Sequence, residues 1–190
     1  MLAAGQSKRF GGIKQLADIV GVPMICHCLS PFRQGDKWRQ GLAHGYVVLG
    51  STASQISEVL PKGVETFNVD SWEQGMGHTL AQSMQHICAD TSHVLIALAD
   101  QITISQKQIE QLIAMSALHR QSIIAAEYNQ SVGVPWAGPR QFFEELRQLS
   151  GDIGAKTVLQ QHLPQVVRVA MPEAALDIDT QWDLQQANAH

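Results

Sequence analysis

Residues 2–16 read LAAGQSKRFGGIKQL, an apolar start that runs into a glycine-rich loop carrying three cations. Gly5 allows the backbone to approach a phosphate or a base closely, and the exposed N–H groups of such a loop form a site for anions. Lys8, Arg9 and Lys14 add positive charge to a chain whose formal net charge is −4. The spacing matches neither the GxxxxGK(S/T) phosphate loop nor the GxGxxG dinucleotide motif. The pattern predicts a strand followed by an anion-binding loop, and the alternative is a glycine-rich turn with solvated charges.

The composition is that of an ordinary soluble globular domain. The chain has 190 residues, of which 45% are hydrophobic and 16% charged, and this length supports one sizeable core. The negative net charge argues against non-specific nucleic-acid binding. We expect no signal peptide and no membrane span, since no apolar run approaches ~20 residues. Three cysteines, an odd number, fit a reduced cytoplasmic compartment, and the one-residue spacing of Cys26-His27-Cys28 does not match a zinc site.

Short apolar runs alternate with amphipathic stretches, which is typical of an α/β domain with a mostly parallel sheet between helix layers. The predicted strands are residues 46–49, 64–69, 93–99, 122–126, 166–169 and 176–178. The predicted helices are residues 53–60, 79–88, 106–118, 140–149, 153–163 and 182–187. The first strand, residues 1–4, is shorter than the five or six residues usual for a buried strand. We therefore expect a single Rossmann-like three-layer domain over residues 1–190, with a shortened first strand.

Three aspartates stand where such a sheet binds ligands. Asp100 follows the apolar run 93–99, and open α/β sheets bind ligands at the carboxyl ends of their strands. Asp177 and Asp179 are two residues apart in a predicted strand and therefore share one face. Carboxylates that face a triphosphate require a cation between them, which favours a Mg²⁺ site. The alternative for each aspartate is a cap of a turn or of a helix.

Residues 73–80, EQGMGHTL, place two glycines and a threonine before a predicted helix. The glycines allow close backbone approach, and Thr79 is able to cap the helix and to donate a hydrogen bond. The alternative is an ordinary helix N-terminus that follows a glycine turn. We interpret His78 as a solvated or capping residue rather than as a catalytic base.

The stretch 2–16 resembles the signature of the MobA-like NTP transferase family, and especially of the molybdenum cofactor cytidylyltransferases. Ala4 stands where guanylyltransferase relatives more often carry a second glycine, which favours CTP. The resemblance implies a fold of the nucleotide-diphospho-sugar transferase type, with the segment 73–80 against the nucleobase. It implies that Lys14, Arg9 and Asp100 are catalytic. The nucleotide-binding residues that it implies are Leu2, Ala3, Ala4, Gly5, Ser7, Arg9, Lys14, Gly75, Gly77 and Thr79.

The resemblance continues through most of the chain. GVP at 133–135 and LSGDIGAK at 149–156 are similar to family segments that border the acceptor site, which implies acceptor-binding roles for Gly133, Pro135, Gly151, Asp152 and Lys156. LDIDTQWDL at 176–184 matches the closing DIDT-x-x-DL, which implies that Asp177 or Asp179 joins Asp100 at the Mg²⁺ site. Three departures are Ile102 in place of a proline, Lys156 in place of an arginine, and Gly138 near a position where the family often has an aromatic residue. A lysine lacks the bidentate fork of an arginine for phosphate.

The implied reaction is an in-line attack by an acceptor phosphate on the α-phosphorus of CTP, which releases pyrophosphate. The implied acceptor is molybdopterin, the pterin phosphate of the molybdenum cofactor, and the expected protein partner is a molybdoenzyme maturation chaperone. One alternative is a related sugar- or polyol-phosphate nucleotidyltransferase, and another is a non-catalytic nucleotide-binding or cofactor-delivery protein. For Lys14 the alternative is a side chain whose stem covers apolar surface while its ammonium stays in water.

Overall fold

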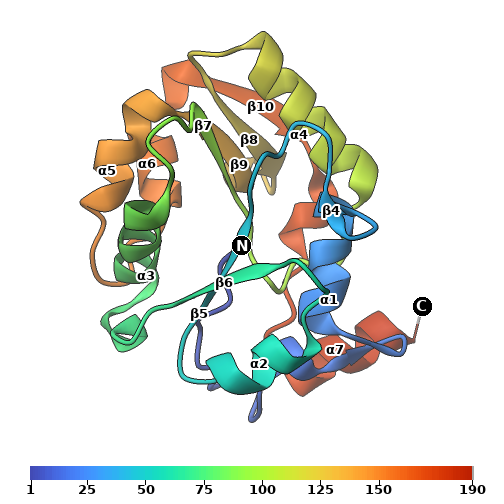
Figure 1. Cartoon of the computed structure of the whole chain (residues 1–190). Coiled ribbons are helices and arrows are strands. Elements are labelled where there is room, and N and C mark those ends of the chain that lie inside the picture. Colours follow the sequence, from blue (N-terminus) through green and yellow to red (C-terminus); the bar gives the residue numbers. More distant parts are fainter. Residues whose placement is uncertain (190) are drawn as a thin grey trace.

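A computed structural model describes residues 1–189, in which helices cover both faces of a mixed sheet (Figure 1). The strands are β5 (Tyr46–Leu49), β6 (Glu65–Asn68), β7 (His93–Ile96), β8 (Ile123–Tyr128), β9 (Ser131–Pro139) and β10 (Val166–Ala170). Four of them pair in the order β10-β8-β9-β7, and β5 pairs with β6. The pairs β10/β8 and β5/β6 are parallel, whereas β9 runs antiparallel to both of its neighbours.

The helices surround this sheet, and two short hairpins project from it. The α-helices are α1 (Met24–Leu29), α2 (Ala53–Val59), α3 (Met76–Ser83), α4 (Gln106–Leu118), α5 (Phe143–Arg147), α6 (Lys156–Gln161) and α7 (Gln181–Asn188). The 3-10 helices are η1 (Lys14–Leu16), η2 (Ser30–Phe32), η3 (Trp72–Gln74), η4 (Met84–His86), η5 (Arg140–Phe142), η6 (Leu163–Gln165) and η7 (Pro172–Ala175). The hairpins are β1 (Asp18–Ile19) with β2 (Val22–Pro23), and β3 (Arg33–Gln34) with β4 (Lys37–Trp38). Among residues 1–189, no helix is both long and apolar enough to cross a membrane.

The predicted first strand is as short as the sequence indicates, and it joins the two parts of the sheet. Leu2 forms isolated parallel bridges with both Val48 and Leu98. Its N–H donates to the carbonyl of Ala97 at 2.8 Å, and the N–H of Ala3 donates to the carbonyl of Val48 at 2.9 Å. The chain therefore leaves the sheet at Ala4, between the ends of β5 and β7, and enters the glycine loop there.

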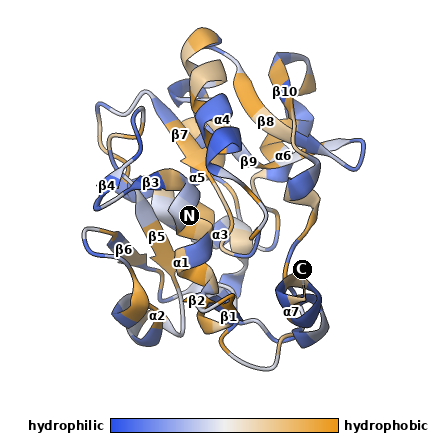
Figure 2. Ribbon diagram, turned by 90° about the vertical axis from the view of Figure 1, so that its right-hand side faces the viewer, coloured by the Kyte–Doolittle hydropathy of each residue, from blue (hydrophilic) through white to orange (hydrophobic). Residues whose placement is uncertain are grey.

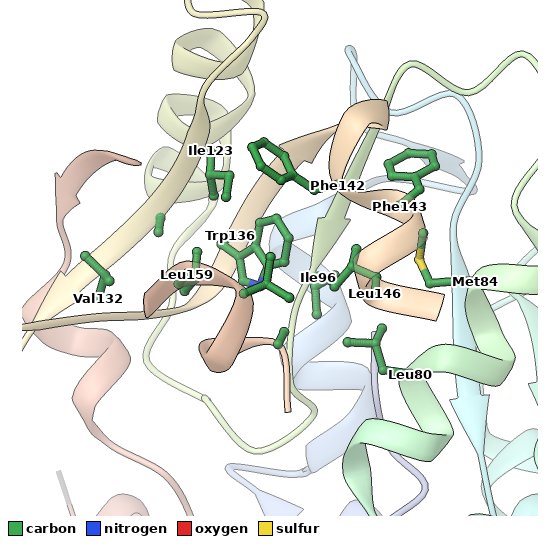
Figure 3. Packing of buried hydrophobic residues seen from close by; sticks show 13 residues of the cluster. Leu80, Met84, Ile96, Ile123, Val132, Trp136, Phe142, Phe143, Leu146 and Leu159 are labelled. Carbon is green, nitrogen blue, oxygen red and sulfur yellow. The ribbon is translucent and has the colours of Figure 1, made fainter. Parts of the chain in front are cut away.

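Two apolar layers flank the sheet, because alternate residues of a strand point to opposite faces. Ile123 and Ala125 of β8 pack in the cluster under α3, α5 and α6, whereas Ile124 and Ala126 pack in the cluster under α4. Figure 3 shows the first cluster, with the fully buried Trp136 at its centre. In Figure 2 the ribbons of β5, β7 and β8 are mostly hydrophobic, whereas α7, which has no buried residue, is mostly hydrophilic.

Several predicted elements differ from the structure. The predicted strand 176–178 is wrong: this segment pairs with no strand, and the N–H of Ile178 donates to the carbonyl of Asp100. The predicted helix 79–88 begins instead at Met76 and its α-helical part ends at Ser83, and the helix predicted over 153–163 covers only Lys156–Gln161. Strand β9 was not predicted, because its two glycines and two prolines are typical of a loop.

Candidate active site

The glycine loop forms one side of a cleft of about 830 Å³ at the carboxyl edge of the sheet. The cleft brings together most of the residues that the sequence indicates: Leu2, Ala3, Ala4, Gly5, Ser7, Arg9, Lys14, Gly75, Thr79, Asp100, Asp152 and Asp179. In the described part of the chain, its lining does not include Gly77, Gly133, Pro135, Gly151, Lys156 or Asp177. The predicted nucleotide-binding set is therefore largely assembled, whereas most of the predicted acceptor set lies outside the cleft lining.

Gln15 holds the glycine loop in place. Its buried side-chain amide donates to the carbonyl of Ala3 at 2.9 Å and to the carbonyl of Gly5 at 3.3 Å. The Ser7 hydroxyl lies 3.5 Å from Gln15 Oε1, and the backbone of Ser7 has a φ of 54°, which is unusual for a residue with a side chain. Because one amide bonds to two carbonyls at the start of the loop, Gln15 holds the segment where the loop leaves the sheet.

Lys14, the first residue of η1, lies between two carboxylates. Its Nζ is 2.8 Å from Asp100 Oδ2 and 3.2 Å from Asp179 Oδ1, and its side chain is only 11% exposed. Burial alone lowers the pKa of Lys14, but the carboxylates of Asp100 and Asp179 outweigh it and raise that pKa. The alternative, in which the ammonium of Lys14 stays in water, is therefore wrong. A buried ammonium, paired with two carboxylates, therefore lies beside the glycine loop.

Asp179 is fixed from two sides. Its Oδ2 accepts from Arg9 Nη2 at 2.8 Å, although the Arg9 side chain is 74% exposed. Its backbone N–H donates to Asp183 Oδ2 at 3.0 Å, and the backbone N–H of Thr180 donates to the same oxygen at 2.7 Å. The Thr180 hydroxyl and these N–H groups lower the pKa of Asp183. Thr180 and Asp183 thus form the capping box of α7, which also orients Asp179.

Asp100 follows β7 in a turn that is anchored without the proline of the family motif. The buried Gln101 side chain donates to the carbonyls of Val134 at 3.0 Å and Ala174 at 2.8 Å. The ring of His27 lies 3.0 Å from the carbonyl of Ile102. Asp100 Oδ2 bonds to Lys14, whereas Oδ1 is buried and has no hydrogen-bond partner. A buried carboxylate oxygen without a partner is costly unless something binds it.

Asp177 lies near Asp100 and Asp179 but does not line the cleft. Burial raises its pKa to about 6, and the negative charges of Asp100 and Asp179 add to that effect. Among residues 1–189, no group of three or more His, Cys, Asp or Glu side chains has the geometry to hold a metal ion. The three-aspartate Mg²⁺ site therefore stays a prediction.

Gly75 and Gly77 are needed for a close backbone contact that the sequence did not reveal. Gly75 has a φ of 104°, and a Cβ on either Gly75 or Gly77 would collide with the backbone of residues 151–153. The N–H of Gly77 donates to the carbonyl of Gly151 at 2.8 Å. The segment predicted to meet the nucleobase is therefore packed, backbone against backbone, on the segment predicted to border the acceptor.

Thr79 and the β9 residues also differ from the simplest expectation. Helix α3 starts at Met76 with Gly75 as its N-cap, so Thr79 is not the cap, and its hydroxyl donates to the carbonyl of Gly75 at 3.1 Å. Gly133 lies in β9, where a side chain would collide with the Tyr128 hydroxyl. Burial raises the pKa of Tyr128, with Asp177 nearby adding to the shift.

The fold and the cleft define a class of α/β proteins with a ligand cleft at the carboxyl edge of the sheet, where a glycine loop and an ordered lysine meet two carboxylates. The family model of the MobA-like NTP transferase domain matches residues 1–166. The chain therefore belongs to the MobA-like NTP transferase family.

Solved structures and curated proteins agree with this assignment. Rv0371c from Mycobacterium tuberculosis H37Rv is 25% identical, with a TM-score of 0.84 over 100% of this chain and 95% of that chain. A nucleotidyl transferase from Methanothermobacter thermautotroptrophicus is 17% identical and shares the fold, with a TM-score of 0.79 over 100% of this chain and 94% of that chain. The bifunctional protein GlmU of Pseudomonas fluorescens is 29% identical over 135 residues, which are 70% of this chain. The matched part is only 28% of that relative's length.

Two residues of the site were not assigned roles from the sequence. Gln15 stands in the quoted motif, but only its burial and its two carbonyl partners reveal that it holds the loop. Asp183 follows Thr180 by three residues, and this spacing is the signature of a capping box that the sequence already contained. The capping pattern was therefore a usable signal, whereas the Gln15 contact needed the folded chain.

Proposed function

We propose that this chain transfers CMP from CTP to a phosphorylated small molecule and releases pyrophosphate. The observation that carries the proposal is Lys14 Nζ, held 2.8 Å from Asp100 and 3.2 Å from Asp179 beside the glycine loop. An ammonium between two carboxylates is positioned to exchange one of them for a phosphate oxygen. Family membership over residues 1–166 supports the same chemistry.

In the proposed mechanism, the backbone N–H groups of the loop bind the triphosphate and Lys14 neutralises charge that develops during displacement at the α-phosphorus. Arg9, largely exposed at the entrance, binds the outer phosphates. The acceptor phosphate attacks in line and pyrophosphate leaves, with no covalent intermediate on the protein. Catalysis then comes from positioning and charge stabilisation, as in other phosphate-transfer enzymes.

A divalent cation fits the residues of the site. Asp100 offers a buried oxygen that has no hydrogen-bond partner, and Asp179 contributes a second carboxylate at the same ammonium. Two carboxylates together with substrate phosphates are the ligand set that Mg²⁺ prefers in nucleotide enzymes. When bound, the ion would neutralise phosphate charge. A related structure, Rv0371c in complex with manganese, is 22% identical and shares the fold.

For the acceptor, we propose molybdopterin, with a molybdoenzyme maturation chaperone as the protein partner and the cytoplasm as the compartment. The LAAG start of the loop and the GD-x-GA segment at 151–155 support this choice. A sugar- or polyol-phosphate acceptor is the second candidate, favoured by fold neighbours named 4-diphosphocytidyl-2C-methyl-D-erythritol synthase and CMP:2-keto-3-deoxy-manno-octonic acid synthetase. A non-catalytic binding protein is the third, and the ordered Lys14–Asp100 pair argues against it.

A pyrophosphate-release assay with Mg²⁺ tests these candidates together. We expect turnover with CTP and molybdopterin, and weaker use of GTP, because Ala4 stands where guanylyltransferase relatives more often carry a second glycine. Turnover only with a sugar or polyol phosphate would replace the acceptor and keep the reaction. Tight CTP binding without pyrophosphate release with either acceptor would support the binding-protein candidate. GTP binding that equals or exceeds CTP binding in a calorimetric titration would contradict the base preference.

A further inference from the structure

Trp72, the first residue of η3, lines the same cleft as the glycine loop but has no role in the chemistry described so far. We infer that the half-buried indole of Trp72 is the wall against which the nucleobase of the bound triphosphate stacks. This inference rests on the proposed function and adds a named base-binding residue to it.

The ring lies over the end of β5, next to the start of the glycine loop. A Cβ placed on Gly50, the residue after β5, would be 2.8 Å from Trp72 Cγ and 2.6 Å from the carbonyl oxygen of Ala4. The indole therefore packs directly on the Gly50 backbone, and any side chain at Gly50 would displace it. The first chain segment leaves the sheet at this same point, so the ring borders the place where the loop begins.

The backbone around Trp72 is fastened on both sides. The N–H of Trp72 donates to the carbonyl of Val69 at 3.3 Å, and the carbonyl of Trp72 accepts from the N–H of Gly75 at 3.1 Å. The preceding hydroxyl, of Ser71, lies 2.7 Å from Nε2 of His78 in α3. These contacts hold the backbone that carries the ring before a ligand arrives, which reduces the entropy lost on binding.

The positions of the charged side chains indicate which end of the cleft would hold the phosphates of a nucleotide and which end would hold its base. Lys14, Asp100 and Asp179 meet on the β7 side of the first segment, where the triphosphate would be neutralised. Trp72 lies on the β5 side of the same segment. A nucleotide whose phosphates lie between the loop and Lys14 would therefore direct its base toward Trp72. An indole face suits any planar base, since stacking depends on the π-face rather than on hydrogen bonding.

The experiment separates the base from the phosphates. Binding of CTP and of inorganic tripolyphosphate, each with Mg²⁺, is measured by calorimetry for the parent protein, Trp72→Leu and Trp72→Phe. Leucine keeps apolar bulk over Gly50 but removes the aromatic face, whereas phenylalanine keeps a face. Trp182→Leu is the matched control, because Trp182 is 66% exposed on α7 and does not line the cleft. Melting temperatures and far-ultraviolet circular dichroism report whether each variant is folded.

We expect Trp72→Leu to weaken CTP binding about tenfold or more, which is the size expected for the loss of one stacked base. Tripolyphosphate binding should stay within about twofold of the parent, and Trp72→Phe and Trp182→Leu should keep CTP binding near the parent value. Equal CTP binding by Trp72→Leu and the parent would overturn the role of Trp72, while leaving the proposed function intact. An equal loss of tripolyphosphate binding would also overturn it, since the ring would then only support the loop. If the parent bound neither ligand, the proposed function itself would fail.

Discussion

Replacing Lys14 by methionine tests the chemistry of the cleft most directly. Methionine keeps an unbranched apolar stem of similar length and removes the charge, so the packing of η1 is largely preserved. The ammonium that lies 2.8 Å from Asp100 and 3.2 Å from Asp179 is lost. Asp100 then loses its cation and Asp179 keeps only the exposed Arg9, and a bound triphosphate loses one positioned positive charge.

Two magnitudes follow from this geometry. Removing one preorganised donor from a transition state lowers kcat by about 10²- to 10³-fold. Breaking a buried ion pair costs about 3–5 kcal/mol and an exposed one about 0–1 kcal/mol. The side chain of Lys14 is 11% exposed and that of Asp100 is 22% exposed, so we expect an intermediate loss of about 1–3 kcal/mol of folding stability. At roughly 2–4 °C per kcal/mol, the melting temperature should fall by several degrees.

The pH dependence of this loss has a defined sign. The folded-state pKa of Lys14 is raised above the ordinary lysine value of 10.5. The stability contributed by the charge is therefore fully present below that value, and it is lost only as the pH rises through the raised pKa. The difference in unfolding free energy between the parent and Lys14→Met should be constant from about pH 7 to pH 9.

The assay is steady-state pyrophosphate release with CTP, together with thermal melting in the presence and absence of Mg²⁺. Mg²⁺ should raise the melting temperature of Lys14→Met more than that of the parent. In the variant, the bound ion would reduce the repulsion between Asp100 and Asp179 that the ammonium of Lys14 no longer offsets. Lys107→Met is the control, since Lys107 is an exposed lysine on α4 outside the cleft. A kcat/KM for Lys14→Met within threefold of the parent would refute the reasoning.

Three further variants test the proposed metal ligand Asp100 and two residues that position the site, Gln15 and Asp183. Asp100→Asn should abolish pyrophosphate release at low Mg²⁺ and leave the circular dichroism spectrum intact, and near-normal turnover would contradict the metal proposal. Gln15→Leu leaves two loop carbonyls without their donor, so the KM for CTP should rise about tenfold. An unchanged KM would contradict the role of Gln15 in holding the glycine loop. Asp183→Asn should cost about 1 kcal/mol at pH 7 in denaturant unfolding. The folded-state pKa of Asp183 is lowered, so the difference in unfolding free energy between the parent and Asp183→Asn should shrink as the pH falls below 3.8. A free-energy difference that persisted at lower pH would show that the charge of the carboxylate is not its cause.

Local patterns in the sequence predicted the elements that local forces determine. The helix predicted over 106–118 has the bounds of α4, because Ile109 and Leu112 mark one apolar face and Ser105 begins a capping box. The strand predicted over 122–126 is β8. Strand β9 was missed because glycine and proline oppose a strand locally. At Gly138, however, a side chain would collide with the ring of Trp136, so the glycine is needed for a core contact.

The candidate site was predictable in composition but not in arrangement. The loop and Asp100 were indicated by their positions after apolar runs, and Lys14 was indicated as one of the three cations of the loop. Their pairing joins residues 86 apart in the chain, and the contact of Lys14 with Asp179 joins residues 165 apart. No periodicity or capping rule reports contacts at such separations. Residues 176–178 show the consequence. Their own pattern predicted a strand, whereas in the structure the N–H of Ile178 donates to the carbonyl of Asp100, in the turn after β7.

The ion pairs of the cleft also explain how an acidic chain could receive a polyanion. In the described structure, the ammonium of Lys14 forms ion pairs with Asp100 and Asp179, so its positive charge is already neutralised before a ligand binds. In the proposed reaction, a triphosphate competes with the aspartates for Lys14 and Arg9, and each carboxylate that is released needs a new cation. Nucleotide and divalent cation should therefore bind with positive coupling. The buried Oδ1 of Asp100, which has no hydrogen-bond partner, is the oxygen that would hold that cation.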